Sequence, residues 1–365
     1  MTNKKKGDTV TAAEIAADLL IHPTAPFYEQ CVIGHIETWA SKTGLDSWRD
    51  KHGNLYVHYK KGKPGRKVTY AVHTDHPGFE FISQNGSDVV ARFLGGVSQA
   101  YFRKGAPVVF YDRQGEERCR ATIQSVRNWK KKWVNFKCAT RLRKGYFGMW
   151  DLAPCTIRSG VLHSRACDDL LGCVALMATF ERLIKLKPVA DVVGVFSRAE
   201  EVGFIGALAL VHSGELEKSR TIISIETSKA LSDAVQGGGP IVRVGDRSSI
   251  FDPAITAEIT ATAENLVKEN SQFKFQRRLM YGGTCESTAY QAYGYRVGAV
   301  CVALGNYHNM GPRNRIELEN IHLSDLNGLI TLLSEFAITK SAPKEELKIR
   351  LSDLLRKSRR RLQSP

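Results

Sequence analysis

The chain of 365 residues has no apolar run near the roughly 18 residues that a membrane-spanning helix needs. Its first ten residues are polar and basic with no apolar stretch behind them, so no signal peptide is expected. The eight cysteines include no Cys-x-x-Cys pair, and several lie in apolar stretches, where cysteine behaves as a small hydrophobe. These absences favour a cytoplasmic protein in a reducing compartment over a secreted or membrane-spanning one.

Acidic residues are scarce in two segments. Residues 101–150 hold 13 lysines and arginines against 3 acidic residues, and residues 341–365 hold 8 against 3. These two segments account for the net charge of +15, so the basicity belongs to particular modules and not to the whole fold. The hydrophobic fraction of 43% and the mass of 40.6 kDa are otherwise those of a globular protein with room for more than one domain.

Strands and helices alternate before residue 78 and after residue 160, which predicts an α/β fold with helices on both faces of one sheet. A capping box at Thr11 and Glu14 begins the first helix. Residues 78–160 instead show short strands separated by glycine turns, typical of a small all-β module. We therefore predict one α/β domain from residues 1–78 and 160–340, a β-rich insertion over 79–159, and a basic tail over 341–365.

Four of the expected strands run directly into histidine, aspartate or glutamate. These residue types can bind metals and are called metal-type residues below. The strand ending at Val72 is followed by His73 and Asp75, and those at 192–196, 221–225 and 298–304 are followed by acidic or histidine residues. Asp168 stands at the start of a long helix. Ligands of open α/β sheets bind beyond the carboxyl ends of the strands, so these positions should meet at one edge. The metal-type residues are His73, Asp168, Glu200, Glu201, Glu226 and His308.

Each residue taken alone has a simpler explanation. His73 could be a satisfied polar residue at a strand end, and Asp168 could cap its helix. Glu226 could lie in a surface turn, His308 could pack on its neighbouring tyrosine, and the Glu200-Glu201 pair could be solvated. Two adjacent carboxylates nevertheless repel each other unless a cation or a shared proton occupies the space between them, and the set together suits two zinc-like ions.

Five motifs occur in the order seen in the tetrahedral, or glutamyl, aminopeptidases, a family of co-catalytic zinc exopeptidases that the chain resembles over residues 10–340. The motifs are His73-Thr74-Asp75, Asp168 to Cys173, Ala199 to Gly203, Gly282-Gly283-Thr284 and Tyr307-His308. The resemblance implies a zinc-peptidase α/β sandwich with an inserted small β-barrel. It also implies assembly into homo-oligomers through the inserted domain, which limits access to short peptides.

The resemblance further implies a role for each site residue. His73 would bind one metal and His308 the other, with Asp168 bridging and Glu201 and Glu226 completing the two sites. Glu200 would be the general base and then the general acid, and Asp75 would orient His73. The cofactor would be two divalent ions, zinc first, with cobalt or manganese as alternatives.

Two positions depart from the family pattern. Glu226 stands where these aminopeptidases more often carry aspartate, and glutamate there accompanies carboxypeptidases and amidohydrolases. Cys285 follows Gly282-Gly283-Thr284 where an acidic residue is usual, and Glu286 could replace it one place later. The cleaved end of the peptide is therefore open between an aminopeptidase and a carboxypeptidase or N-acyl amidohydrolase.

The basic module interleaves aromatic and cationic residues in Trp129-Lys130-Lys131-Lys132-Trp133. That composition suits nucleic acid, but a solvated face, a subunit contact or attraction of acidic peptides explains it without a nucleic-acid motif. The tail has helical spacing from Glu345 to Arg361, which predicts a short docking helix, with a partner or membrane-surface role as alternatives. A metal-dependent exopeptidase, most of all an aminopeptidase, is thus expected, against a nucleic-acid-binding or scaffold protein on an inactive peptidase fold.

Overall fold

Residues 11–339 and 343–363 are described by a computed structural model, with the side chains of 343–347 and 363 excepted. The first ten residues, where no signal peptide was expected, lie outside this range. No helix in the described ranges is both long enough and apolar enough to cross a bilayer. The predicted capping box is confirmed: Thr11 accepts from the amide of Glu14 and the Glu14 carboxylate accepts from the amide of Thr11.

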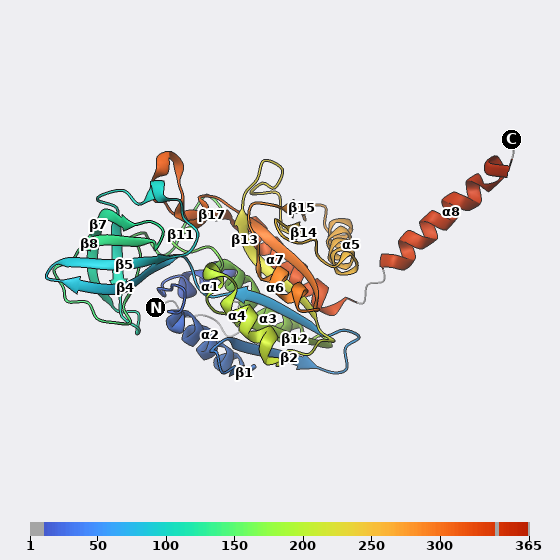
Figure 1. Ribbon diagram of the computed structural model, residues 1–365. Coiled ribbons are helices and arrows are strands. Elements are labelled where there is room, and N and C mark those ends of the chain that lie inside the picture. The colour runs from blue at the N-terminus through green and yellow to red at the C-terminus, as the bar shows by residue number, and fades with distance from the viewer. Residues whose placement is uncertain (1–10, 340–342, 364–365) are drawn as a thin grey trace.

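An eight-stranded sheet forms the centre of the α/β part, in the order β1-β2-β12-β3-β13-β16-β14-β15 (Figure 1). Its four inner strands, β12, β3, β13 and β16, run parallel, whereas β2 and β14 join them antiparallel. The strands are β1 (Asp46–Arg49), β2 (Leu55–Lys61), β12 (Ala190–Ser197), β3 (Val68–His73), β13 (Thr221–Lys229), β16 (Arg296–Leu304), β14 (Ile241–Asp246) and β15 (Gln276–Met280).

Helices cover both faces of this sheet, as predicted. Because successive strand side chains point to opposite faces, Val192 packs with the α1, α2, α3, α5 and α7 layer while Val193 packs with α4 and α6. The near-continuous apolar inner strands follow from this two-sided burial. The helices are α1 (Ala12–Leu19), α2 (Gln30–Thr43), α3 (Leu170–Leu186), α4 (Ile205–Ser213), α5 (Pro253–Glu269), α6 (Glu286–Ala292) and α7 (Leu323–Ile338).

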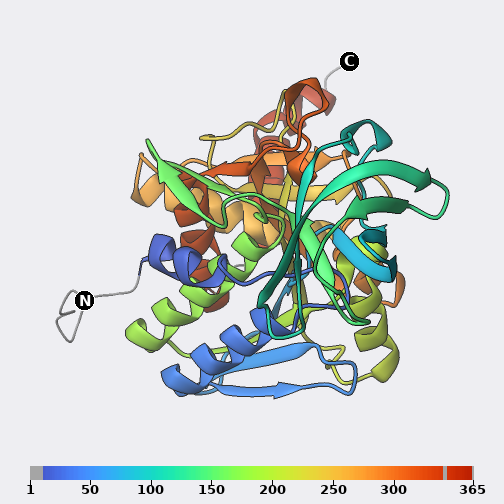
Figure 2. The ribbon, with the colours of Figure 1, turned by 90° about the vertical axis from the view of Figure 1, so that its left-hand side faces the viewer.

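A closed six-stranded barrel is inserted between β3 and the rest of the α/β fold, and it lies at one end of the molecule (Figures 1 and 2). Its core is aromatic: the Phe79 ring meets those of Phe93, Phe136 and Trp150 edge-on at 5.0–5.1 Å. The barrel order is β4 (Gly78–Asn85), β5 (Asp88–Leu94), β8 (Trp133–Lys137), β7 (Glu117–Asn128), β6 (Pro107–Tyr111) and β9 (Phe147–Trp150). The predicted α/β fold with an inserted barrel is confirmed.

Gly78 allows the chain to enter the barrel close to the α/β part. A Cβ atom there would lie 2.7 Å from the Ala25 Cβ and 2.8 Å from the Gly148 carbonyl oxygen. Any larger residue would have to push these segments apart.

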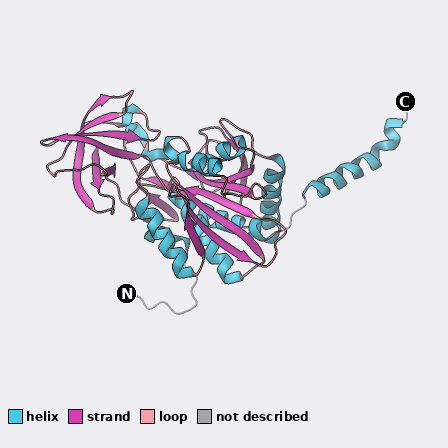
Figure 3. Cartoon of the chain, turned by 60° about the horizontal axis from the view of Figure 1, so that its bottom comes forward, coloured by secondary structure: helices cyan, strands magenta, loops and turns pink. Residues whose placement is uncertain are grey.

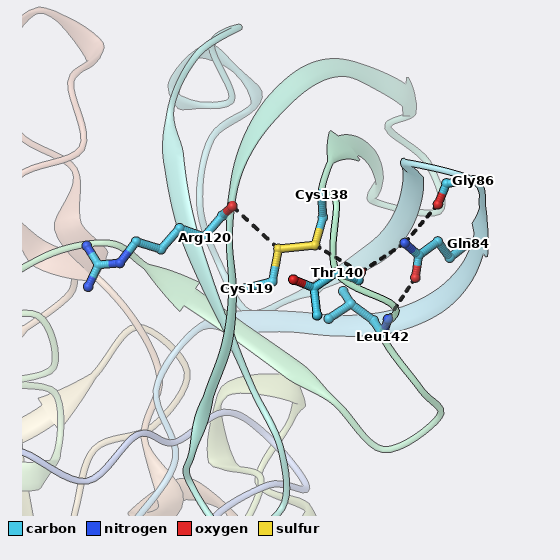
Figure 4. The surroundings of a disulfide bond; sticks show 7 residues. All are labelled: Gln84, Gly86, Cys119, Arg120, Cys138, Thr140 and Leu142. Atoms are coloured by element: carbon cyan, nitrogen blue, oxygen red, sulfur yellow. Dashed lines mark hydrogen bonds between the residues drawn. A yellow bond between two sulfur atoms is a disulfide. The ribbon is translucent and has the colours of Figure 1, made fainter.

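A disulfide joins Cys119 on β7 to Cys138, just after β8 (Figure 4). It is the one cysteine pair among the described residues, and the other six thiols are free. The sequence favoured a reducing compartment and indicated no pairing of these two cysteines, which lie 19 residues apart with no recognisable spacing. The antiparallel pairing of β7 with β8 is what brings them together.

The remaining elements are a small sheet and the C-terminal helix. The small sheet has the order β10 (Thr156–Arg158), β11 (Val161–Ser164) and β17 (Glu319–His322). Helix α8 (Pro343–Gln363) extends away from the α/β part at the end opposite the barrel (Figures 1 and 3). The tail is thus helical as predicted, with Leu351, Leu354 and Leu355 54–57% exposed, and the expected docking of this helix stays a prediction.

Candidate metal centre

The metal-type residues predicted at strand ends lie together at the carboxyl edge of the four parallel strands. His73 ends β3, Glu200 and Glu201 follow β12, Glu226 lies in β13 and His308 follows β16. Asp168 precedes α3 and reaches the same edge. All are buried or nearly so. Their convergence follows from the parallel pairing of β3 with β12 and β13, and of β13 with β16.

These side chains form two adjoining groups. In each group the potential ligand atoms lie within 4.8 Å of one another. Asp168 connects the groups, because its Oδ1 is 3.5 Å from His73 Nε2 and its Oδ2 is 3.5 Å from His308 Nε2. The first group is His73, Glu200 and Glu226, and the second is Asp168, Glu201 and His308.

Glu200 and Glu201 face different groups although they are adjacent in sequence. The Oε2 of Glu200 lies 3.9 Å from His73 Nε2, whereas the Oε1 of Glu201 lies 3.0 Å from His308 Nε2. Asp75 holds the turn that separates them, because its two carboxylate oxygens accept the amides of Glu200 and Glu201 at 2.9 and 3.0 Å. Its backbone carbonyl lies 3.2 Å from His73 Nδ1, which leaves Nε2 directed at the cluster.

Glu319 is a buried carboxylate that sequence reasoning missed. It accepts the amides of Cys167, Asp168 and His308, and so fixes the backbone on which two of the clustered side chains stand. It lies 152 residues from Cys167, at the start of an unremarkable strand, so no local sequence signal could have identified it.

His76 and Thr227 were also missed. The Nδ1 of His76 lies 2.7 Å from the Asp168 carbonyl oxygen, and its Nε2 lies 3.1 Å from Asn309. The hydroxyl of Thr227 donates to Asp168 Oδ1 at 3.1 Å. The signal available for both was proximity in sequence to a predicted ligand, three residues from His73 and one from Glu226.

The barrel contributes to the cluster through a backbone carbonyl. The Nδ1 of His308 lies 2.8 Å from the Gly96 carbonyl oxygen, which lies on the segment after β5. A hydrogen bond there would keep a proton on Nδ1, so that Nε2, which faces Asp168 and Glu201, is the nitrogen left to bind an ion. The backbone of His308 has a φ of +54°, and its ring stacks on that of Tyr307 with the ring centroids 3.7 Å apart. His308 therefore both packs on its neighbouring tyrosine and belongs to the cluster.

The carboxylates of the cluster are buried and close together, which makes their charged forms unfavourable. Burial raises the pKa of Glu200 well above its usual value and that of Glu226 to about 8. Burial lowers the pKa of His73 and His308, but the neighbouring carboxylates outweigh it and hold both pKa values well above the usual one. Divalent cations among these groups would relieve the repulsion between the carboxylates.

Unsatisfied buried atoms also fit a metal. Glu201 Oε1 and His308 Nε2 make no hydrogen bond although they are 3.0 Å apart. Imidazole and carboxylate donors in this combination are the ligands of zinc and similar ions. The cavity that these residues line has a volume of about 60 Å³, which gives room for ions and water. Its wall also includes Lys229, Arg243 and the segment Gly282 to Cys285.

Glu286 does not join the cluster. Its Oε1 accepts a hydrogen bond from the Ser197 hydroxyl at 2.5 Å, and it is absent from the cavity wall, to which Cys285 belongs instead. The idea that Glu286 replaces a missing family carboxylate therefore has no support from the geometry.

Solved structures with similar folds include aminopeptidases and peptidases. The *Pyrococcus horikoshii* TET1 peptidase, described as forming a tetrahedron or a large octahedral shell, is 21% identical over 90% of this chain and 100% of its own, with a TM-score of 0.75. A TET aminopeptidase from a marine sediment archaeon of the Thaumarchaeota is 19% identical over 90% and 96%, with a TM-score of 0.76.

Sequence comparison points the same way. A protein of *Acetivibrio thermocellus* named "Putative aminopeptidase" is 26% identical over 311 residues, which cover 78% of this chain and 86% of that protein. The profile of the family described as M42 glutamyl aminopeptidase matches residues 137–332, more than half of the chain. The predicted resemblance is confirmed: the chain belongs to the M42 glutamyl aminopeptidase family, whose members are metal-dependent exopeptidases.

Proposed function

We propose that this aminopeptidase removes N-terminal residues from short peptides with two divalent ions, zinc first, held in the cluster between His73 and His308. The observation that carries the proposal is the position of Asp168, whose two oxygens are each 3.5 Å from one of the two imidazoles. A carboxylate in that position suits a bridge between two ions. When bound, the ions would polarise the scissile carbonyl and acidify water.

The remaining side chains divide into ligands and a proton carrier. His73 and Glu226 would hold one ion, and His308 and Glu201 the other. Glu200 also lies within reach of the first group, but its place beside the adjoining ligand Glu201 suits a proton-transfer role. Glu200 would take a proton from water and deliver it to the leaving amine. Asp75 would hold Glu200 and His73 in place through its contacts with both segments.

The cleaved end of the peptide is tested with matched peptides. The metal-loaded enzyme is assayed on one peptide with a free amino terminus, on its N-acetyl form and on its C-terminal amide. An aminopeptidase cleaves the free and the amidated forms and rejects the acetylated one, which we expect here. Glutamyl and leucyl versions are both included, because Lys229 and Arg243 on the cavity wall favour an acidic first side chain.

Two outcomes would contradict the proposal. Cleavage of the acetylated form with rejection of the amide would instead indicate the carboxypeptidase that Glu226 left open. Activity that survives removal of metal by a chelator would exclude the metal centre as its source. The control is restoration of activity by added zinc, with cobalt and manganese tested in parallel.

We also propose that the chain forms homo-oligomers through the inserted barrel. The support is the fold likeness to the TET1 peptidase, whose own description includes tetrahedral and octahedral assemblies. Light scattering coupled to size-exclusion chromatography should give a mass several times 40.6 kDa. A monomer at micromolar concentration would contradict this. We further propose a cytoplasmic location.

A further inference from the structure

A basic groove lies between the barrel and the α/β part, next to the metal centre. Its volume is about 680 Å³, roughly tenfold that of the cavity at the metal-type residues. Glu201 lines both spaces, so the groove begins where the cluster ends. The groove is lined by Phe27, Arg92 to Gly95, Lys130 to Trp133, Glu201, Val202 and Ile205.

The lysines in this groove are not neutralised. No salt bridge within residues 11–339 or 343–363 involves Lys130, Lys131 or Lys132, whereas Arg92 is paired with Glu80 at 2.7 Å. Lys130 and Lys131 are exposed. The one carboxylate in the lining, Glu201, faces His308 in the cluster. The groove therefore presents a surplus of positive charge beside an acidic centre.

A short chain of contacts connects the basic turn to the metal centre. The Lys132 ammonium donates to the Gly95 carbonyl at 2.5 Å, and the next carbonyl, that of Gly96, lies 2.8 Å from His308 Nδ1. The turn between β7 and β8 is therefore held at a fixed place relative to the ligand His308. A ligand in the groove would lie next to the place where a peptide is cut.

The tryptophans of the turn are not available for stacking on bases. Trp129 is partly buried against the barrel core, with its ring 5.1 Å from that of Phe102. The cations of Lys131 and Arg127 lie over the Trp133 ring, 4.8 and 5.8 Å from its centroid. Binding of single-stranded nucleic acid relies on free aromatic faces as well as on cations. The arrangement therefore favours a ligand that needs charge alone.

We propose that this groove binds the carboxylates of peptide residues that follow the scissile bond, so that peptides acidic beyond their first residue are preferred. The proposal rests on the proposed aminopeptidase function. With the N-terminal residue at the cluster, the rest of the peptide needs a larger space, and the adjoining groove offers it. The exposed side chains of Phe27 and Ile205 would contact the peptide backbone, while Lys130 and Lys131 meet its charges.

The test compares four peptides that share their first two residues and so the same scissile bond. The third and fourth residues are Asp-Asp or Asn-Asn, each with a free or an amidated carboxyl terminus. We expect the wild type to favour the Asp-Asp amide by about tenfold in kcat/KM at low salt, and the preference to shrink in about 0.5 M salt. In the double variant Lys130→Gln/Lys131→Gln the preference should fall to about twofold. Both lysines are replaced together because each exposed ion pair contributes little by itself.

The matched control is Arg141→Gln/Lys144→Gln, which removes the same charge from exposed barrel residues outside the groove. Every rate is normalised to that on an aminoacyl anilide, which has nothing downstream. A preference that follows the free carboxyl terminus instead of the Asp side chains would assign the same groove to the terminal carboxylate.

Three results would overturn the assignment: an unchanged preference in the groove variant, an equal loss in the control variant, or inhibition by an oligonucleotide that depends on Lys130 and Lys131. If the enzyme cleaves the anilide but shows no preference for carboxylates, only the groove assignment is overturned. An enzyme that cleaves neither anilide nor peptide overturns the proposed function as well.

Discussion

Glu200 and Glu201 are chemically identical neighbours whose surroundings separate them. Glu201 is 3.0 Å from His308, while Glu200 points to His73 at 3.9 Å. The turn that separates them depends on Asp75, whose two carboxylate oxygens accept both amides. In the sequence, the family resemblance implied two different roles for these neighbours, but it did not say which acid faces which histidine.

Replacement of Glu200 by glutamine tests the division of roles. Glutamine keeps the shape but cannot carry a proton, so kcat should fall at least about 100-fold while bound metal is retained. Metal content by elemental analysis and initial rates on an unblocked peptide give both quantities. Glu201→Gln is the comparison variant, since it should lower metal content together with activity. A Glu200→Gln enzyme that turns over normally would refute the proton-transfer role.

At the scale of secondary-structure elements, one buried ion pair joins the inner strands on the side away from the metal centre. Asp191 on β12 pairs with Arg220, which precedes β13, and contacts His58 on β2 at 3.0 Å. Arg220 also donates to the Val68 carbonyl on β3. Asp191 and Arg220 are both 4% exposed, so the two charges rely on each other.

Replacement of Asp191 by asparagine should lower the free energy of unfolding by about 3–5 kcal/mol at pH 7, because Arg220 would be left buried without its partner. Burial raises the pKa of Asp191, but Arg220 and His58 outweigh it and hold that pKa below its usual value. The folded protein therefore binds this proton less tightly than the unfolded chain does. The ion pair therefore stabilises the folded state fully at pH values above the pKa of Asp191 in the unfolded chain, about 3.9. This contribution is lost as the pH falls through the lower pKa of Asp191 in the folded state.

Urea denaturation at several pH values measures this difference. The gap between wild type and Asp191→Asn should be full at pH 7 and should narrow below about pH 4. The exposed Lys67–Glu217 pair, 2.7 Å long, supplies the control, because Glu217→Gln should change stability by less than about 1 kcal/mol. A gap of the same size at acid and neutral pH would show that proton linkage at Asp191 is not its origin.

Most elements could be predicted from their periodicity. The long helix expected to start at Asp168 is α3 (Leu170–Leu186), and the strand expected over 298–304 is β16 (Arg296–Leu304). The pairings between elements could not be predicted in the same way. The Cys119–Cys138 disulfide depends on β7 lying antiparallel to β8, and Glu319 reaches Cys167 through the small sheet.

At the scale of the whole molecule, the two basic segments occupy opposite ends. The barrel stands at one end and α8 extends from the other, with the balanced α/β part between them (Figure 1). The barrel segment also contacts the candidate metal centre, through the Gly96 carbonyl at His308, and lines the adjoining groove, through Lys130 to Lys132. An insertion that reads in sequence as a separate module thus contributes to the site on the α/β part.

The sequence by itself determined which residues could bind metal and that they would meet. Strand periodicity is a local property, and the carboxyl ends of parallel strands share one edge, so His73, Glu226 and His308 could be brought together without coordinates. The tertiary structure alone decided what surrounds them. Glu319, Gly96 and the basic groove act through contacts between segments far apart in the chain, and such contacts depend on packing that no local pattern encodes.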